Sequence, residues 1–169
     1  LSIHLVDQGY GKAQVGMLWS IGVLAEILVF LAMPSLLRVW SLRAVLIVCF
    51  AVAVVRFLII GWLAGTVALL VIAQLMHAIT FGAYHASAVA ALNRWFPASH
   101  QARVQALYSS VSFGAGGMSG GLLAGWTWEA LGAGITFSIA SGFAAIGLAL
   151  VVAFVREADD ADRKHAASP

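Results

Sequence analysis

Long apolar segments constrain this chain more than any other feature of its sequence. Several windows of about 20 residues, the length that spans a bilayer as a helix, carry at most one charged side chain. Hydrophobic residues make up 62% of the 169 positions and charged residues only 9%, and the mean hydropathy is +0.98. A soluble domain needs a much larger share of charged residues for its surface. The sequence therefore predicts an integral membrane protein.

Five segments are long enough to cross the hydrocarbon core of a bilayer. They are residues 14–36, 42–63, 67–91, 104–126 and 134–155. Residues 1–6 are expected to be the outer end of a sixth helix, and the glycine-containing segment DQGYGKAQ is expected to be the loop that follows it. The predicted fold is therefore an all-α polytopic membrane helix bundle over residues 1–155. Residues 156–169, which are rich in charge, are expected to form a disordered cytoplasmic tail.

The start of the chain and its basic residues predict its context and orientation. The chain begins Leu1-Ser2 without Met or a signal peptide, so we expect it to be part of a longer protein. Cytoplasmic loops of membrane proteins are enriched in Lys and Arg. Seven basic residues fall at one set of predicted span ends, whereas the other set has Lys12 alone. We therefore expect a multi-pass protein of the cell inner (plasma) membrane, with its carboxy terminus in the cytoplasm.

The fourth predicted span is rich in glycine. Gly117, Gly121 and Gly125 repeat every four residues, and Gly114 extends the same helix face. Such a face lets a neighbouring backbone approach closely, because no side chain holds the two helices apart. The pattern predicts tight helix packing, with a substrate groove along this face as the alternative.

Three ionisable residues lie deep within predicted spans. At 1.5 Å per residue, Glu26, Arg56 and His77 fall roughly 18, 10 and 15 Å below the outer surface, in one layer. A charge at this depth costs about 2.5 kcal/mol or more and normally faces a partner or a wet cavity. We expect Glu26 and Arg56 to pair across consecutive helices, and all three residues to serve substrate binding or proton coupling. The alternative is a structural ion pair beside a neutral packing histidine.

A polar and aromatic stripe runs along the third predicted span. Gln74, His77, Phe81 and Tyr84 fall on one face of that helix, so they are candidate substrate and proton-coupling residues. The pKa of histidine is near 6.5 in water, so modest changes of environment switch its charge. His85 lies further round the helix and is the weaker candidate.

Other chemistries fit the sequence poorly. A zinc site needs three or four ligands, and only two histidines and one carboxylate are expected near one another. Motifs of hydrolases, phosphate-binding loops and Cys–His nucleophiles are missing from the sequence, and Cys49 is its one cysteine. The formal charge of +2 gives no argument for a nucleic-acid partner. We therefore expect neither an enzyme nor a metal or other cofactor.

Several segments together suggest a family. The segments AEILVF, VVRFLI, QLMHAITFGAYHA and QALYSSVSFGAGG, with the basic loop PSLLRVWSLR, resemble the carboxy-terminal half of the major facilitator superfamily. Within it, they are most similar to the phenylpropionate permease branch, which is related to lactose and nucleoside proton symporters. The resemblance covers nearly the whole chain, from the end of the seventh family helix through the twelfth. It implies a transporter whose amino-terminal six-helix half is missing here, with alternating access around a central site.

The resemblance also implies roles for individual residues. In lactose-permease-like members, a Glu, an Arg and a His on the eighth, ninth and tenth helices serve substrate binding and proton coupling, and Glu26, Arg56 and His77 occupy those helices here. Thr80 stands where such symporters carry a proton-handling carboxylate. This leaves Glu26 or a group in the missing half as the proton carrier.

The function that we expect is proton-coupled symport of a small organic solute such as an aromatic carboxylate. Arg56 would bind the carboxylate through paired donors, and Phe81 and Tyr84 would contact the ring. The expected partners are the lipid bilayer, the solute, the proton and the missing half. A sugar or nucleoside symporter, in which Glu26 and Gln74 carry more of the hydrogen bonding, is one alternative. A non-transporting scaffold or receptor is the other.

Overall fold

The computed structural model describes residues 1–155, and within that range the chain forms helices and short connections with no strand. Residues 156–169, for which a tail was predicted, lie outside the described residues. The helix is π-helical over η1 (Ala78–Ala83) and η3 (Ser110–Ala115), and η2 (Ala98–His100) is a short 3₁₀ turn. The elements in chain order are α1 (Ser2–Asp7), α2 (Lys12–Val39), α3 (Leu42–Trp62), α4 (Val67–His77), η1 (Ala78–Ala83), α5 (Tyr84–Trp95), η2 (Ala98–His100), α6 (Gln101–Ser109), η3 (Ser110–Ala115) and α7 (Gly116–Phe154).

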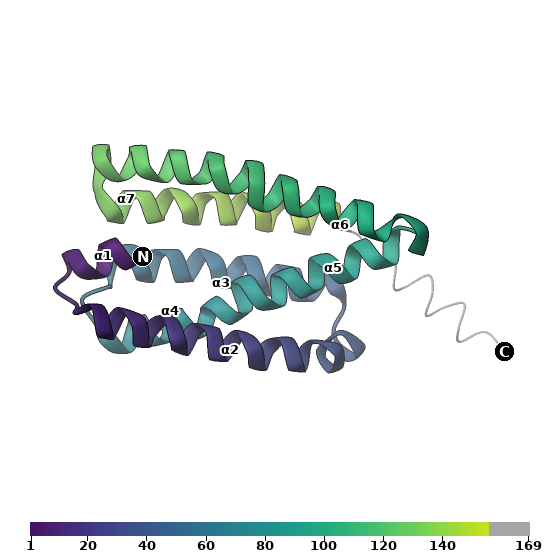
Figure 1. Cartoon of the computed structure of the whole chain (residues 1–169), viewed down its shortest axis with the longest axis horizontal. Coiled ribbons are helices and arrows are strands. Elements are labelled where there is room, and N and C mark those ends of the chain that lie inside the picture. Colours follow the sequence, from purple (N-terminus) through teal and green to yellow (C-terminus); the bar gives the residue numbers. More distant parts are fainter. Residues whose placement is uncertain (156–169) are drawn as a thin grey trace.

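Four helical segments in the described residues are long and apolar enough to cross a membrane. They are Lys12–Val39, Leu42–Trp62, Val67–Trp95 and Ala98–Phe154. The last has 57 residues, and it is interrupted at Gly132, where a φ of 78° lies in the region that favours glycine. Figure 1 shows α7 doubling back on itself at one end of the bundle. The all-α membrane fold is thus confirmed, whereas the count of five spans plus the end of a sixth stays a prediction.

We call residues 116–131 the first limb of α7 and residues 133–154 its second limb. The connections α2–α3 and α5–α6 and the end of the second limb lie together at one end of the bundle (Figure 1). The connections α1–α2 and α3–α4 lie at the other end, with the reversal of α7. The described basic residues predicted to be cytoplasmic therefore belong to elements that meet at a single end. Which compartment that end faces stays a prediction.

Helix starts are fixed by local hydrogen bonds. The side chain of Ser41 accepts a hydrogen bond from the backbone N–H of Ala44 at 3.2 Å, which caps the start of α3. At the start of α2, the backbone N–H of Gly11 donates to Oε1 of Gln14 at 2.8 Å. These contacts satisfy donors that the helix itself leaves unpaired or that lie just before it.

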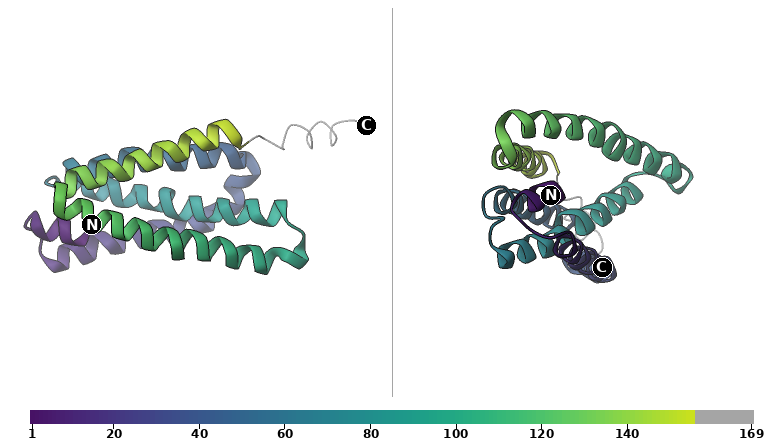
Figure 2. Two further views of the ribbon diagram at one scale, coloured as in Figure 1. Left: turned by 90° about the horizontal axis from the view of Figure 1, so that it is seen from above. Right: turned by 60° about the vertical axis from the view of Figure 1, so that its left-hand side comes forward.

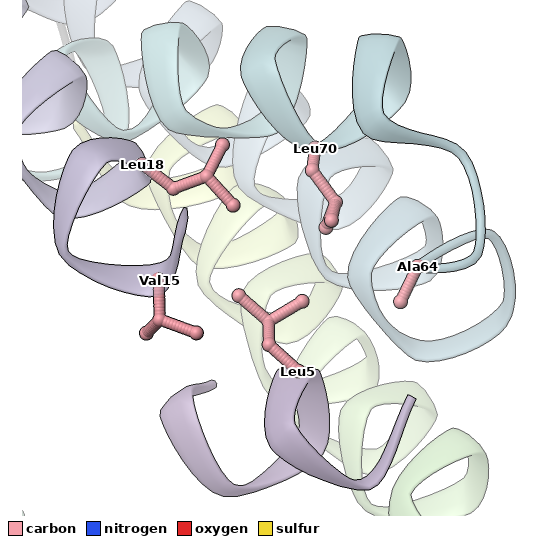
Figure 3. Close-up of a cluster of buried hydrophobic side chains, with 5 residues drawn as sticks. All are labelled: Leu5, Val15, Leu18, Ala64 and Leu70. Atoms are coloured by element: carbon pink, nitrogen blue, oxygen red, sulfur yellow. The ribbon is translucent and has the colours of Figure 1, made fainter. Parts of the chain in front are cut away.

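A small apolar cluster joins the elements at the end of the bundle that carries α1. Leu5 of α1, Val15 and Leu18 of α2, Ala64 of the α3–α4 connection and Leu70 of α4 point toward one another (Figure 3). All five side chains are buried, and that of Leu5 is fully inaccessible to solvent. The cluster fixes α1 against the longer helices, although α1 has only six residues.

Glycines opposite aromatic rings bring α3 and the second limb of α7 together. A Cβ atom at Gly61 of α3 would lie 2.9 Å from Cβ of Phe137. A Cβ atom at Gly147 would collide with the ring of Phe50. Cβ of Phe137 and the ring of Phe50 therefore occupy space that a larger residue than glycine would fill, which is the close packing that small residues allow between membrane helices.

The glycine face predicted for helix packing has no partner within the described residues. A Cβ atom at Gly117 or Gly121 would meet nothing within 4 Å, and the same holds for Gly114 and Gly125. These glycines lie on η3 and on the first limb, whereas the packed glycines lie on α2, α3, η1 and the second limb. Packing of this face against a helix outside residues 1–155 stays a prediction.

Candidate functional site

A cavity of about 1160 Å³ lies between α3, the continuous helix of α4, η1 and α5, and both limbs of α7. Helix α3 lines the cavity with Phe50, Arg56 and Phe57. The continuous helix of α4, η1 and α5 lines it with His77, Thr80, Phe81 and Tyr84. The first limb of α7 supplies small residues, among them Gly116, Ser119, Gly120 and Ala124, as well as Leu123, Trp128 and Glu129. The second limb supplies Phe137 and Phe143. The cavity is thus mainly apolar and aromatic with a few polar groups, which is the usual composition of a small-molecule site.

Among the described residues, Arg56 is the only Lys or Arg side chain that lines the cavity. Its Nε donates a hydrogen bond to the carbonyl oxygen of Ala73 in α4 at 3.0 Å, and its guanidinium carbon lies 5.6 Å from the centre of the Phe57 ring. Within residues 1–155, the side chain of Arg56 makes no hydrogen bond other than the one to Ala73. Its two terminal nitrogens therefore remain available to a ligand, in the planar arrangement that suits a carboxylate.

His77 ends α4 and lines the same cavity. Its Nδ1 is buried and has no hydrogen-bond partner among the described residues. Its ring stacks on Phe81 with centres 5.5 Å apart and planes 26° apart, and its Cδ2 lies 3.7 Å from where a Cβ of Gly22 in α2 would be. A buried nitrogen without a partner is costly, so this atom needs a hydrogen-bond partner that residues 1–155 do not supply in this arrangement.

The stack of rings continues away from the cavity. His85 lies parallel to Phe81, with centres 6.3 Å apart and planes 12° apart, but it does not line the cavity. A hydrogen bond of 3.5 Å joins its Nδ1 to the hydroxyl of Tyr108 on α6. The placement of His85 behind the cavity wall agrees with its weaker standing as a candidate.

The two π-helical turns meet beside the cavity. Phe81 of η1 and Phe113 of η3 have ring centres 6.2 Å apart, and each is followed by Gly and Ala. π-helical turns within α-helices occur frequently at functional sites, because they shift the side chains that follow them around the helix axis. Here one such turn carries Thr80 and Phe81 into the cavity wall.

Gln74 lies on the predicted stripe but not on the cavity wall. Its side chain is 4% exposed, and its Nε2 donates to the carbonyl oxygen of Leu18 in α2 at 3.1 Å. The residue therefore links α2 to α4. The substrate contact predicted for Gln74 has no support in this arrangement.

Glu26 also lies outside the cavity wall, and the direct contact with Arg56 that the sequence suggested is not formed. A Cβ atom at Gly82 of η1 would lie 3.0 Å from Cγ of Glu26, whereas Arg56 bonds Ala73 of α4. The physical reason is the helix arrangement, because α4 and η1 pack against both α2 and α3. The consecutive helices α2 and α3, which carry Glu26 and Arg56, are therefore not close neighbours here.

Several cavity residues were missed by the sequence analysis. Phe57 adjoins Arg56 in sequence and could have been found from that position, but Phe50 and Phe137 lie in apolar runs without a distinguishing signal. Among residues 1–155, no group of three or more His, Cys, Asp and Glu side chains is placed to hold a metal ion.

A bundle of membrane-crossing helices around a cavity with a part-buried cation and aromatic walls fits a membrane protein that binds or transports a small molecule. Residues 1–139 match the model of the MFS_1 like family, so the chain belongs to this family of major facilitator superfamily transporters. It is a multi-pass membrane protein, and the family that the sequence suggested is confirmed.

A curated relative agrees with this assignment. The chain is 35% identical over 144 residues to the Probable 3-phenylpropionic acid transporter of Escherichia coli (strain K12). The match covers 82% of the chain and 36% of the relative, so the chain corresponds to about a third of that protein. No solved structure matches the chain.

Proposed function

We propose that this chain forms part of a secondary active transporter that takes up a small aromatic carboxylate, such as a 3-phenylpropionate-like acid, together with protons. The observation that carries the proposal is the setting of Arg56. Its Nε is fixed by Ala73, its terminal nitrogens are free to form paired hydrogen bonds, and the wall around it is aromatic. A substrate with a carboxylate attached to an aromatic ring would pair its carboxylate with Arg56 and pack its ring against the aromatic side chains.

The printed name of the Escherichia coli relative supports the same class of substrate. The sugar or nucleoside alternative assigned hydrogen bonding to Gln74 and Glu26, and the placement of these two residues gives it less support, although Ser119, Thr127 and Glu129 do line the cavity. Gln74 is engaged with Leu18, and neither residue lines the cavity. A non-transporting scaffold would have no use for a cavity of about 1160 Å³ with a part-buried arginine. A receptor would bind its ligand in such a cavity, so measured uptake is what separates it from a transporter.

Proton coupling is assigned to His77 in this proposal. His77 shares the cavity with Arg56, and its buried Nδ1 has no partner within residues 1–155. A bound carboxylate near Arg56 would favour protonation of a histidine beside it, and release of the carboxylate would favour loss of the proton. Glu26, in contact with Gly82 behind the same helix, remains the second candidate.

The proposal is tested by uptake of labelled 3-phenylpropionate into proteoliposomes that contain the complete protein, with any segments beyond residues 1–169 included. We expect uptake to rise when the outside is made acidic and to fall when a protonophore collapses the gradient. We also expect unlabelled aromatic acids to compete, and a disaccharide or nucleoside not to compete. Competition by a sugar or nucleoside alone would favour the alternative substrate class. Absence of any solute uptake would favour the scaffold or receptor.

A further inference from the structure

The first limb of α7 lines the cavity opposite the wall that carries Arg56 and His77, with small side chains over residues 116–120 and with larger ones, Leu123, Trp128 and Glu129, further along. Gly120 is one of the residues that line the cavity from this limb. A Cβ atom at this position would meet nothing within 4 Å, so any added side chain would extend into open space. Gly116 is less open, because a Cβ there would lie 3.2 Å from the carbonyl oxygen of Val111.

The level of Gly120 along the bundle follows from the contact between the two π-helical turns. Phe81 and Phe113 are neighbours at 6.2 Å, and the helices that carry them run in opposite directions (Figure 1). From Phe113 to Gly120 the chain advances about 10 Å at 1.5 Å per residue. The same advance from Phe81 in the opposite chain direction reaches the stretch between His77 and Ala73. Gly120 therefore lies at the level where Ala73 holds Arg56.

The two helices diverge as they leave the α5–α6 connection. Figure 2 (right) shows the first limb of α7 separating from α5 and α4 with distance from that connection. At the level of Gly120, this separation is occupied by the cavity and not by packed side chains. Gly120 is therefore one of the residues that bound the space opposite Arg56 and His77.

We infer that Gly120 sets the upper limit on the size of the apolar group that a bound carboxylate can carry. This inference rests on the proposed function. With the carboxylate at Arg56, the ring of the substrate extends across the cavity toward the first limb, where the missing side chain of Gly120 leaves room for it. A larger side chain at position 120 would take that room from the ring but not from a small acid.

The inference is tested with Gly120→Ala and Gly120→Val in the complete protein, reconstituted in proteoliposomes. We expect the KM for labelled 3-phenylpropionate to rise in steps with side-chain size, by about tenfold for Gly120→Val, because the added side chain takes the space into which the ring extends from Arg56. The ability of butyrate, a carboxylate without a ring, to compete for the site should stay within about twofold of its original value.

The matched control is Gly142→Val on the second limb of α7. Gly142 is exposed, a Cβ there would meet nothing within 4 Å, and it does not line the cavity. This variant should leave both acids unaffected. An unchanged KM for 3-phenylpropionate in Gly120→Val, or an equal loss of 3-phenylpropionate and butyrate, would overturn the inference.

A second measurement does not depend on transport by the valine variant. The thiol introduced by Gly120→Cys should react with N-ethylmaleimide, and 3-phenylpropionate should slow that reaction, whereas the thiol from Gly142→Cys should react at the same rate with and without the acid. Mass spectrometry of peptides separates these thiols from Cys49. Lack of protection at position 120 would contradict the inference. If the unaltered protein neither binds nor transports 3-phenylpropionate, the proposed function itself fails, and this inference fails with it.

Discussion

The Nε atom of Arg56 donates a hydrogen bond to the carbonyl oxygen of Ala73 at 3.0 Å, so the backbone of α4 holds the charged side chain of α3. This contact uses one edge of the guanidinium and leaves the terminal nitrogens toward a cavity with aromatic walls. The charge is thus fixed in place before any ligand arrives. A site that needs no rearrangement of its charged group loses less free energy on binding.

Replacing Arg56 tests whether substrate binding depends on the paired N–H donors of the guanidinium as well as on its positive charge. Arg56→Lys keeps a positive charge but loses Nε and the paired donors. We expect the KM for 3-phenylpropionate to rise about tenfold or more, since hydrogen bonds to charged groups contribute about 1.5 to 3 kcal/mol each. The control is Arg103→Lys at an exposed position on α6, which should leave KM unchanged. A normal KM in Arg56→Lys would remove the arginine from the substrate site.

Replacing the two histidines separates the cavity wall from the layer behind it. His77→Ala should keep expression and membrane insertion but lose substrate affinity or the pH dependence of uptake, because His77 lines the cavity with an unpaired Nδ1. His85→Ala should have a smaller effect, because His85 contacts Tyr108 outside the cavity. Uptake measured across a range of pH values gives the comparison, and normal pH-dependent uptake by His77→Ala would return that residue to a packing role.

Replacing Gln74 tests whether its side chain serves helix packing or substrate binding. Gln74→Leu removes the hydrogen bond to Leu18 while it keeps a similar volume. We expect a small loss of stability, about 0.6 kcal/mol as is typical of hydrogen bonds between membrane helices, and an unchanged KM. Thermal unfolding in detergent and substrate uptake give the two readings. A raised KM at unchanged stability would place Gln74 in the substrate site after all.

The contact between Gly147 and Phe50 predicts a stability difference within one limb of α7. Gly147→Ala would force the Phe50 ring from its place, where it also meets Tyr84 edge-on at 5.5 Å between centres. We expect a loss of about 1 to 3 kcal/mol, seen as a lower midpoint of thermal unfolding. Gly142→Ala, at an open position of the same limb, should not lower the midpoint, because alanine favours helix more than glycine does. Equal midpoints for the two variants would contradict the packing described here.

The sequence alone determined the membrane class, the helical fold and the end of the bundle at which the basic connections meet. These properties follow from composition and from the order of residues along one helix, which are local. The same kind of reasoning placed Arg56, His77, Phe81 and Tyr84 as site candidates, and all four line one cavity. A charged or polar residue in an apolar span gives a strong signal by itself, because hydrocarbon is such a poor solvent for it.

Only the tertiary structure decided which helices are neighbours. The sequence paired Glu26 with Arg56 because their helices are consecutive, but α4 and η1 pack against both of those helices, and Ala73 takes the hydrogen bond. It also favoured the repeated glycines of the first limb for packing, whereas Gly147 and other single glycines meet aromatic rings within residues 1–155. A glycine contributes to packing only through what lies opposite it, and the partner is set by the arrangement of helices in space, which no local pattern specifies.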